Sequence, residues 1–144
     1  MNRYEQMKKI LSGELPQPPI GQLLGFQLVE LEEGRAVFEM EASERYHNPM
    51  GTLHGGVLCD ISDAAMGVAF ASTLAENETM TTIELKINFL KPVWNARLRA
   101  VAKIIKKGST IGLVECDVFD EKNSLVAHST STLMILRGDM SRGR

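Results

Sequence analysis

The pattern of apolar and polar residues repeats with two different periods along this chain, one typical of strands and one typical of a helix. Apolar and polar residues alternate one by one over residues 26–42 and again from about residue 81 onward, which predicts β-strands. Between these two parts, residues 54–75 follow the period of an α-helix. The pattern therefore predicts a group of strands, one long helix and a second group of strands, in that order.

The strands are expected to be short and antiparallel. The stretch FQLVELEEGRAVFEMEAS predicts a hairpin that turns at EEG. After the helix, TTIELKINFLKPV predicts a strand that Pro92 ends. Three more strands, separated by the turn sequences KKGS and DEKNS, are expected over residues 96–107, 110–119 and 125–136. Consecutive strands grouped around one core helix indicate an α+β domain.

The N-terminal part, about residues 1–24, is predicted to be helical. Residues 3–12 follow the pattern of a short amphipathic helix, and the prolines of ELPQPPIG end it before one more helical turn at residues 20–24. The last residues, about 137–144, form a polar tail. Because 144 residues is a common size for one domain, we expect a single domain over residues 1–144.

Composition and charge exclude several classes of function. The chain is 44% hydrophobic and 24% charged, which is ordinary for a globular protein. A net charge of −2 gives no basic field for nucleic acid. No apolar run is long enough to span a membrane, and the N-terminus lacks the apolar segment of a signal peptide, so we expect a cytoplasmic protein. No CxxC motif or Cys/His cluster has zinc spacing, so no metal is expected.

The long helix is apolar nearly all round, which predicts that it is buried. Its small and apolar residues are Val57, Leu58, Ile61, Ala64, Ala65, Val68, Ala69 and Ser72. Asp63 lies in the middle of this helix. A lone buried carboxylate is unfavourable by several kcal/mol, so it finds a partner or shifts its pKa, and such groups concentrate at functional sites, although a structural pair is also possible. Asp60, three residues earlier, is the rival acid, because spacing alone does not choose between the two.

The start of the helix is the second candidate site. Gly55 and Gly56 lie where the loop becomes helix, and the first amides of a helix have no internal partners and carry a partial positive charge. Such amides bind phosphate or stabilise an oxyanion, while the alternative is that the glycines only permit a tight turn. Asn48 and His54 flank this point. Asn48 before a proline is equally explained as a turn residue, and His54 as a helix-entry residue bonded to backbone.

Distance constrains how these groups cooperate. Asp63 follows Gly55 by eight positions, which is about 12 Å along a helix. A single carbonyl therefore cannot touch both groups within one subunit. Cooperation requires two helices side by side, as in a two-fold dimer that contains the site twice.

The segment N-P-M-G-T-L-H-G-G followed by D-I-S-D-A-A-M-G-V-A resembles the hot-dog-fold acyl-CoA thioesterases, in the PaaI-like (phenylacetic-acid-pathway type) branch. The matching residues are Asn48, His54, Gly55, Gly56 and Asp63, and the likeness extends over about residues 20–136. This resemblance implies a curved antiparallel sheet wrapped round one long central helix. It also implies a homodimer as the active unit, which commonly pairs into a homotetramer.

The same resemblance implies roles for the site residues. The Gly55 amide, in the motif that begins with His54, would polarise the thioester carbonyl. Asp63 of the other subunit, rather than Asp60, would act as general base or nucleophile, and Asn48 would place the water or the carbonyl. Thr82 takes the position of a Ser or Thr that assists the acid, with the neighbouring Thr81 as the alternative.

The expected function is hydrolysis of an aryl- or fatty-acyl-CoA to free acid and CoA. No cofactor is expected, because CoA is part of the substrate. Two alternatives are a non-catalytic acyl-CoA-binding module and a hydroxyacyl-thioester dehydratase, which would use a His paired with an acid, a role for which His54 in the HGG turn is poorly placed. Cations available for CoA phosphates, none of them singled out, are Lys86, Lys91, Arg97, Lys106, Lys107 and Arg137.

Overall fold

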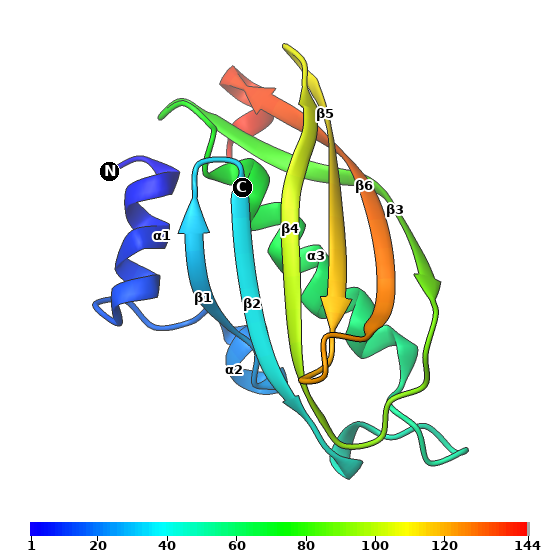
Figure 1. Cartoon of the computed structure of the whole chain (residues 1–144). Helices are drawn as coiled ribbons and strands as arrows, with labels where there is room; N and C mark the ends of the chain where they lie inside the picture. The colour runs from blue at the N-terminus through cyan, green and yellow to red at the C-terminus, as the bar shows by residue number, and fades with distance from the viewer. Residues whose placement is uncertain (144) are drawn as a thin grey trace.

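A six-stranded antiparallel sheet curves round one long helix, α3 (Gly55–Ala71), as Figure 1 shows. The computed structural model describes residues 1–143, so residue 144 of the predicted polar tail lies outside the described residues. The strands are β1 (Gln27–Glu32), β2 (Arg35–Ala42), β3 (Glu78–Phe89), β4 (Ala96–Lys107), β5 (Ile111–Phe119) and β6 (Leu125–Arg137). Their order in the sheet is β1-β2-β4-β5-β6-β3. The predicted α+β fold, with a curved sheet around a central helix, is confirmed.

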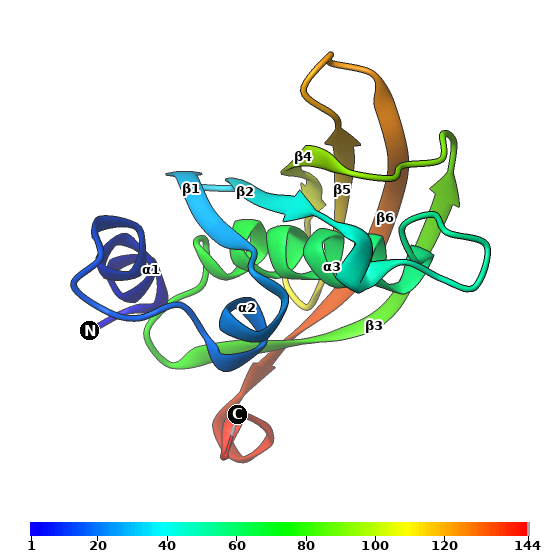
Figure 2. The same ribbon diagram turned by 90° about the horizontal axis from the view of Figure 1, so that it is seen from below.

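Two helices precede the sheet, α1 (Arg3–Ser12) and α2 (Pro19–Leu24), as the sequence predicts. The Asn2 side chain caps α1 by accepting a 2.8 Å hydrogen bond from the Glu5 amide, and Gly13 ends the helix with φ 84°. Short 3-10 helices, η1 (Glu44–Tyr46) and η2 (Gly138–Ser141), follow β2 and β6. Figure 2 shows α2 beside α3, between β1 and β3, on the side that the sheet leaves open.

The core lies between α3 and the sheet. Ile61, Ala65, Ala69 and Phe70 are fully buried on the helix face that meets the strands. Gly112 of β5 makes room for Phe70, because a Cβ at position 112 would collide with the ring. A glycine here therefore sets how closely helix and sheet can approach.

The prediction that α3 is buried nearly all round is wrong for the single chain. Asp60 and Asp63 are exposed, and Ala64 and Gly67 are only half-buried. The helix also ends at Ala71, before the predicted residue 75. The hydroxyls of the next two residues donate 2.7 Å hydrogen bonds to helix carbonyls, which removes acceptors from a further turn.

Strand β3 forms one edge of the sheet. It begins at Glu78 rather than at the predicted Thr81, because its first residues pair with the end of the long strand β6. The register shifts between Thr82 and Glu84, and Ile83 at this bulge is 55% exposed. The edge of β3 is therefore long and has no neighbouring strand within residues 1–143.

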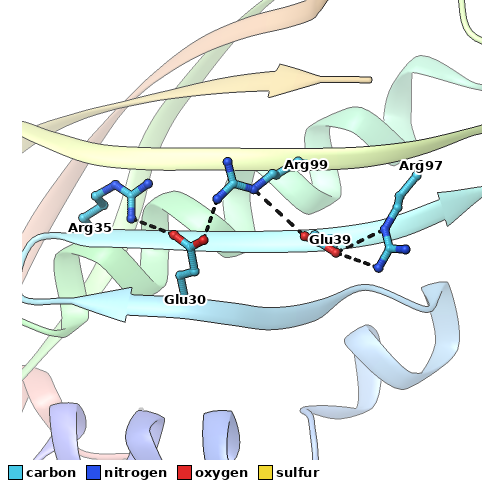
Figure 3. Close-up of polar contacts among 5 residues, drawn as sticks. All are labelled: Glu30, Arg35, Glu39, Arg97 and Arg99. Atoms are coloured by element: carbon cyan, nitrogen blue, oxygen red, sulfur yellow. Dashed lines mark hydrogen bonds and ion pairs between the residues drawn. The ribbon is translucent and has the colours of Figure 1, made fainter. Parts of the chain in front are cut away.

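An ion-pair ladder crosses the outer face of β1, β2 and β4 (Figure 3). Glu30 bonds Arg35 at 3.0 Å and Arg99 at 2.6 Å, and Glu39 bonds Arg97 at 2.9 Å. The Arg35 hydrogen bond, helped by Arg99, holds the pKa of Glu30 below its usual value. These exposed pairs reinforce the strand register but are each worth about 1 kcal/mol or less.

Candidate active site

The loop before α3 is closed by one side chain. The Asn48 carbonyl oxygen accepts hydrogen bonds from the amides of Met50 at 3.0 Å and Thr52 at 3.2 Å, and its amide nitrogen donates to the Thr52 hydroxyl at 3.0 Å. Gly51 completes the turn with φ 84°, which favours glycine. Asn48 therefore has the turn contacts that its position before a proline suggested, and its action on substrate stays a prediction.

The start of α3 presents free amide groups. The His54 amide donates to the Tyr46 carbonyl at 3.0 Å, which fixes the direction of entry into the helix. The His54 side chain makes no cap hydrogen bond, and its ring lies over Gly56, where a Cβ would stand 3.0 Å from it. Among residues 1–143 no acceptor is recorded for the amides of Gly55 and Gly56. These two donors can therefore meet an incoming carbonyl.

A hollow of about 460 Å³, the amide hollow, opens at this helix start, and Asn48, Gly55 and Phe89 are among its lining residues. The Phe89 ring, 55% exposed, lies 2.8 Å from where a Gly55 Cβ would stand. Sequence reasoning missed Phe89 as a site residue, since its only signal was its place at the end of a predicted strand. A larger residue at position 55 would therefore collide with Phe89, which explains a glycine here on steric grounds, independently of any catalytic role.

The carboxylate of Asp63 lies further along α3, with Thr82 beside it. The Thr82 hydroxyl donates to Asp63 at 3.4 Å, so the structure brings these two predicted residues together, and within residues 1–143 Thr81 makes no such bond. Desolvation raises the pKa of Asp63, Asp60 adds to the increase, and the Thr82 hydrogen bond opposes it. The side chain is exposed in the single chain rather than buried as expected. The pKa is nevertheless raised, because Asp63 stands at the mouth of an apolar cavity.

This Asp63 cavity has a volume of about 260 Å³. Apart from Asp63 and Thr82, its walls are apolar: Met7, Pro18, Ile20, Phe26, Phe38, Ala64, Gly67, Val68 and Met80. These residues come from α1, from α2 and the segments flanking it, from β2, and from α3 and β3. The cavity shares no lining residue with the amide hollow. One chain therefore does not bring Gly55 and Asp63 together, as their spacing predicts.

Most of the cations considered for CoA phosphates are already engaged. Five of the six have polar partners within their own chain: Lys86, Lys91, Arg97, Lys107 and Arg137. Within residues 1–143 only Lys106 of this set has none. In the same range, no helix is long and apolar enough to cross a membrane, and no cluster of three or more His, Cys, Asp or Glu could hold a metal ion.

Comparisons with known proteins identify the family of the chain. Residues 50–127 match the model of the thioesterase superfamily. A candidate esterase of Saccharolobus solfataricus is 36% identical over 118 residues, which cover 82% of this chain and 84% of that protein. The 1,4-dihydroxy-2-naphthoyl-CoA hydrolase of Listeria monocytogenes is 29% identical over 112 residues, covering 78% of this chain and 91% of the relative.

Solved structures agree on the fold. The E. coli PaaI protein from the phenylacetic acid degradation operon superimposes with a TM-score of 0.83 at 20% identity, covering 95% of this chain and 98% of that one. The family match spans just over half of the chain and contains both the helix start and Asp63. The chain therefore belongs to the thioesterase superfamily, as a hot-dog-fold thioester hydrolase similar in fold to PaaI.

Proposed function

We propose that this protein hydrolyses an aryl- or fatty-acyl-CoA thioester to the free acid and CoA. The active unit is a homodimer in which Gly55 of one subunit and Asp63 of the other act on the same carbonyl. The observation that carries this proposal is that α3 contributes to two separate hollows, with Gly55 in one and Asp63 in the other. One hollow holds unbonded amides, and the other holds a carboxylate of raised pKa beside an apolar cavity.

The chemistry follows from these groups. The Gly55 amide donates to the thioester oxygen as it becomes an oxyanion. Asp63, ionised, takes a proton from water as the oxygen of that water bonds to the carbonyl carbon. The C–S bond then breaks, and the proton passes to the departing CoA sulfur. A raised pKa makes Asp63 a stronger base near neutral pH, and direct attack of Asp63 to form an anhydride is the alternative.

The other site residues act around this pair. The Thr82 hydroxyl orients Asp63 and favours its ionised form. Asn48 holds the loop that presents the helix start, and it places the water or the carbonyl in the amide hollow. His54 leads the chain into the helix. Within residues 1–143 it has no hydrogen bond to a carboxylate. The His128 ring does contact the Asp117 carboxylate at 2.6 Å, but this pair lines neither the amide hollow nor the Asp63 cavity, which disfavours the dehydratase alternative.

The assembly joins two subunits along their β3 edges. Among the described residues that edge has no neighbouring strand, and it exposes Ile83. We also propose, from the family resemblance, that two dimers pair into a homotetramer and that the enzyme is cytoplasmic and needs no cofactor. For the substrate, the Listeria relative supports an aromatic acyl-CoA, since its name gives it a naphthoyl-CoA as substrate.

The first experiment measures thiol release from phenylacetyl-, hydroxybenzoyl- and medium-chain acyl-CoA by the purified protein. We expect turnover of at least one of them. A silent panel would contradict the proposed activity.

The second experiment tests whether the site spans two subunits. Gly55 is the first residue of α3, where proline is tolerated, and His54 before it has φ −63° and ψ 129°, which suit a residue preceding proline. Gly55→Pro therefore removes the amide donor while keeping the helix. Gly55→Ala is the matched control, because it adds the same Cβ against Phe89 and keeps the N–H.

Refolding Gly55→Pro chains together with Asp63→Asn chains gives mixed dimers that contain one intact site. We expect each variant alone to be inactive and the mixture to recover roughly a quarter of wild-type activity, since half of the dimers are mixed. A mixture as inactive as its parents would show that the two groups do not work across subunits.

A further inference from the structure

A second cavity adjoins the Asp63 cavity. Its volume is about 200 Å³, and it is lined by Arg3, Gln6, Met7, Ile10, Gln17, Pro18, Leu28, Phe38 and Val68. The two cavities share four lining residues: Met7, Pro18, Phe38 and Val68. The two spaces are therefore adjacent, and these four residues form a wall between them; the Asp63 cavity holds the carboxylate, and the second cavity is lined in large part by residues of α1.

Only one member of this wall is both flexible and held by a peripheral element. Pro18 has a fixed ring, Phe38 is a core residue packed edge-on against Phe26 at 5.7 Å, and Val68 belongs to α3. Met7 comes from α1, is half-buried, and carries an unbranched side chain. Methionine fills irregular gaps and changes rotamer easily. The position of the wall therefore depends mainly on Met7.

We propose that the two cavities together form the acyl pocket of the enzyme, that residues 3–24 close it, and that Met7 sets the length of acyl group it accepts. This proposal rests on the proposed function, because it takes Asp63 as the group at the reacting end. An apolar cavity of about 150 Å³ binds benzene, so the Asp63 cavity has room for a single aromatic ring or a medium-length chain.

The lining also defines the chemistry of the acyl group. In the Asp63 cavity the only polar side chains are Asp63 and Thr82, at the end where the carbonyl reacts. A charged group on the part of the acyl chain that lies in the Asp63 cavity would lose its hydration there with no partner. The favoured substrates are therefore uncharged aromatic or aliphatic acyl-CoA thioesters. Because the family match begins only at residue 50, the element that selects the substrate lies outside the matched region.

The experiment compares kcat/KM for butanoyl-, octanoyl-, tetradecanoyl- and phenylacetyl-CoA in four proteins. These are the wild type, Met7→Ala, Met7→Phe and the control Leu11→Ala, which alters the same helix away from both cavities. Removing the wall should raise the tetradecanoyl-to-octanoyl ratio of kcat/KM about tenfold, because discrimination per methylene in an apolar pocket is of that order.

The Met7→Phe variant should move the preference the other way, toward butanoyl-CoA, and Leu11→Ala should keep the wild-type profile. Melting temperatures report on folding, and if Met7→Ala fails to fold, Met7→Phe still carries the test. An active wild type whose chain-length profile is unchanged in the folded Met7 variants would overturn the acyl pocket and leave the proposed function standing. A wild type inactive on every thioester would instead refute the proposed function, and the pocket with it.

Discussion

The two faces of α3 differ in almost every property. The face toward the sheet carries fully buried apolar side chains, among them Ile61, Met66 and Phe70, packed against strands that leave room for them. The open face carries two carboxylates and small residues, and it borders a cavity instead of a packed neighbour. Side chains on the sheet face pack the core, whereas the open face leaves a cavity unfilled and holds the Asp63 carboxylate beside it.

This difference teaches where the helix contributes stability and where it contributes chemistry. Apolar burial on the sheet face favours folding. On the open face, Asp63 in its ionised form opposes folding, because partial desolvation raises its pKa above the usual value. Substitutions on the two faces should therefore separate activity from stability.

The largest effect is expected for Asp63→Asn. Loss of a general base should lower kcat by about 10²–10⁴-fold. The melting temperature at neutral pH should not fall: a carboxyl group whose pKa is raised by folding favours the native state below its unfolded pKa, and this contribution is lost as pH rises through the folded pKa. Kinetics with thermal melts at several pH values check both expectations.

Asp60→Asn is the matched control for this prediction. It removes the neighbouring charge from the same open face and keeps Asp63. We expect less than a tenfold loss of kcat. Equal losses in the two variants would erase the distinction between the acids.

On the opposite face, Gly112→Ala should reduce stability and spare the chemistry. The added Cβ collides with the Phe70 ring, which is fully buried and has nowhere to move. Overpacking of this kind costs about 1–3 kcal/mol. Denaturant unfolding should report that loss, while kcat of the folded fraction stays near wild type. Normal stability would mean that the helix and sheet are less tightly packed than described.

The local pattern of apolar and polar residues predicted most elements of this fold, because their bounds depend mainly on nearby residues. The alternation over 96–107 gave β4 its observed bounds. The end of α3 was missed because hydroxyl groups after Ala71 compete for the helix carbonyls, which periodicity does not register. The start of β3 was missed because residues 78–80 become strand only through their pairing with distant β6.

The sequence predicted the main residues of the candidate site, but it did not predict the cavity and the side chains that surround them. Motif and spacing indicated Gly55 and Asp63, and the Thr82 contact lies where the resemblance suggested. The exposure of Asp63 and the cavity beside it depend on how α1 and α2 pack, which is a long-range property. The Phe89 ring against Gly55 likewise follows from tertiary packing alone.

The smallest effect is expected for Thr82→Val. The Thr82 hydrogen bond lowers the pKa of Asp63, so removing it should raise that pKa further. The acidic limb of the kcat/KM profile should then move to higher pH, with a loss of only a few-fold at the optimum. The neighbouring variant Thr81→Val, which breaks no bond to Asp63, should leave the limb in place. An unshifted limb in Thr82→Val would mean that Asp63 is not the titrating base.

The outer edge of β3 pairs with no other strand within residues 1–143, and this has a consequence for how the enzyme works at low concentration. Twelve residues of edge strand leave a row of backbone donors and acceptors for which a second copy is the natural partner. If catalysis requires that pairing, turnover per molecule obeys mass action and fades on dilution below the dissociation constant of the pair. Protein concentration would then act as a switch for this enzyme, with no effector required.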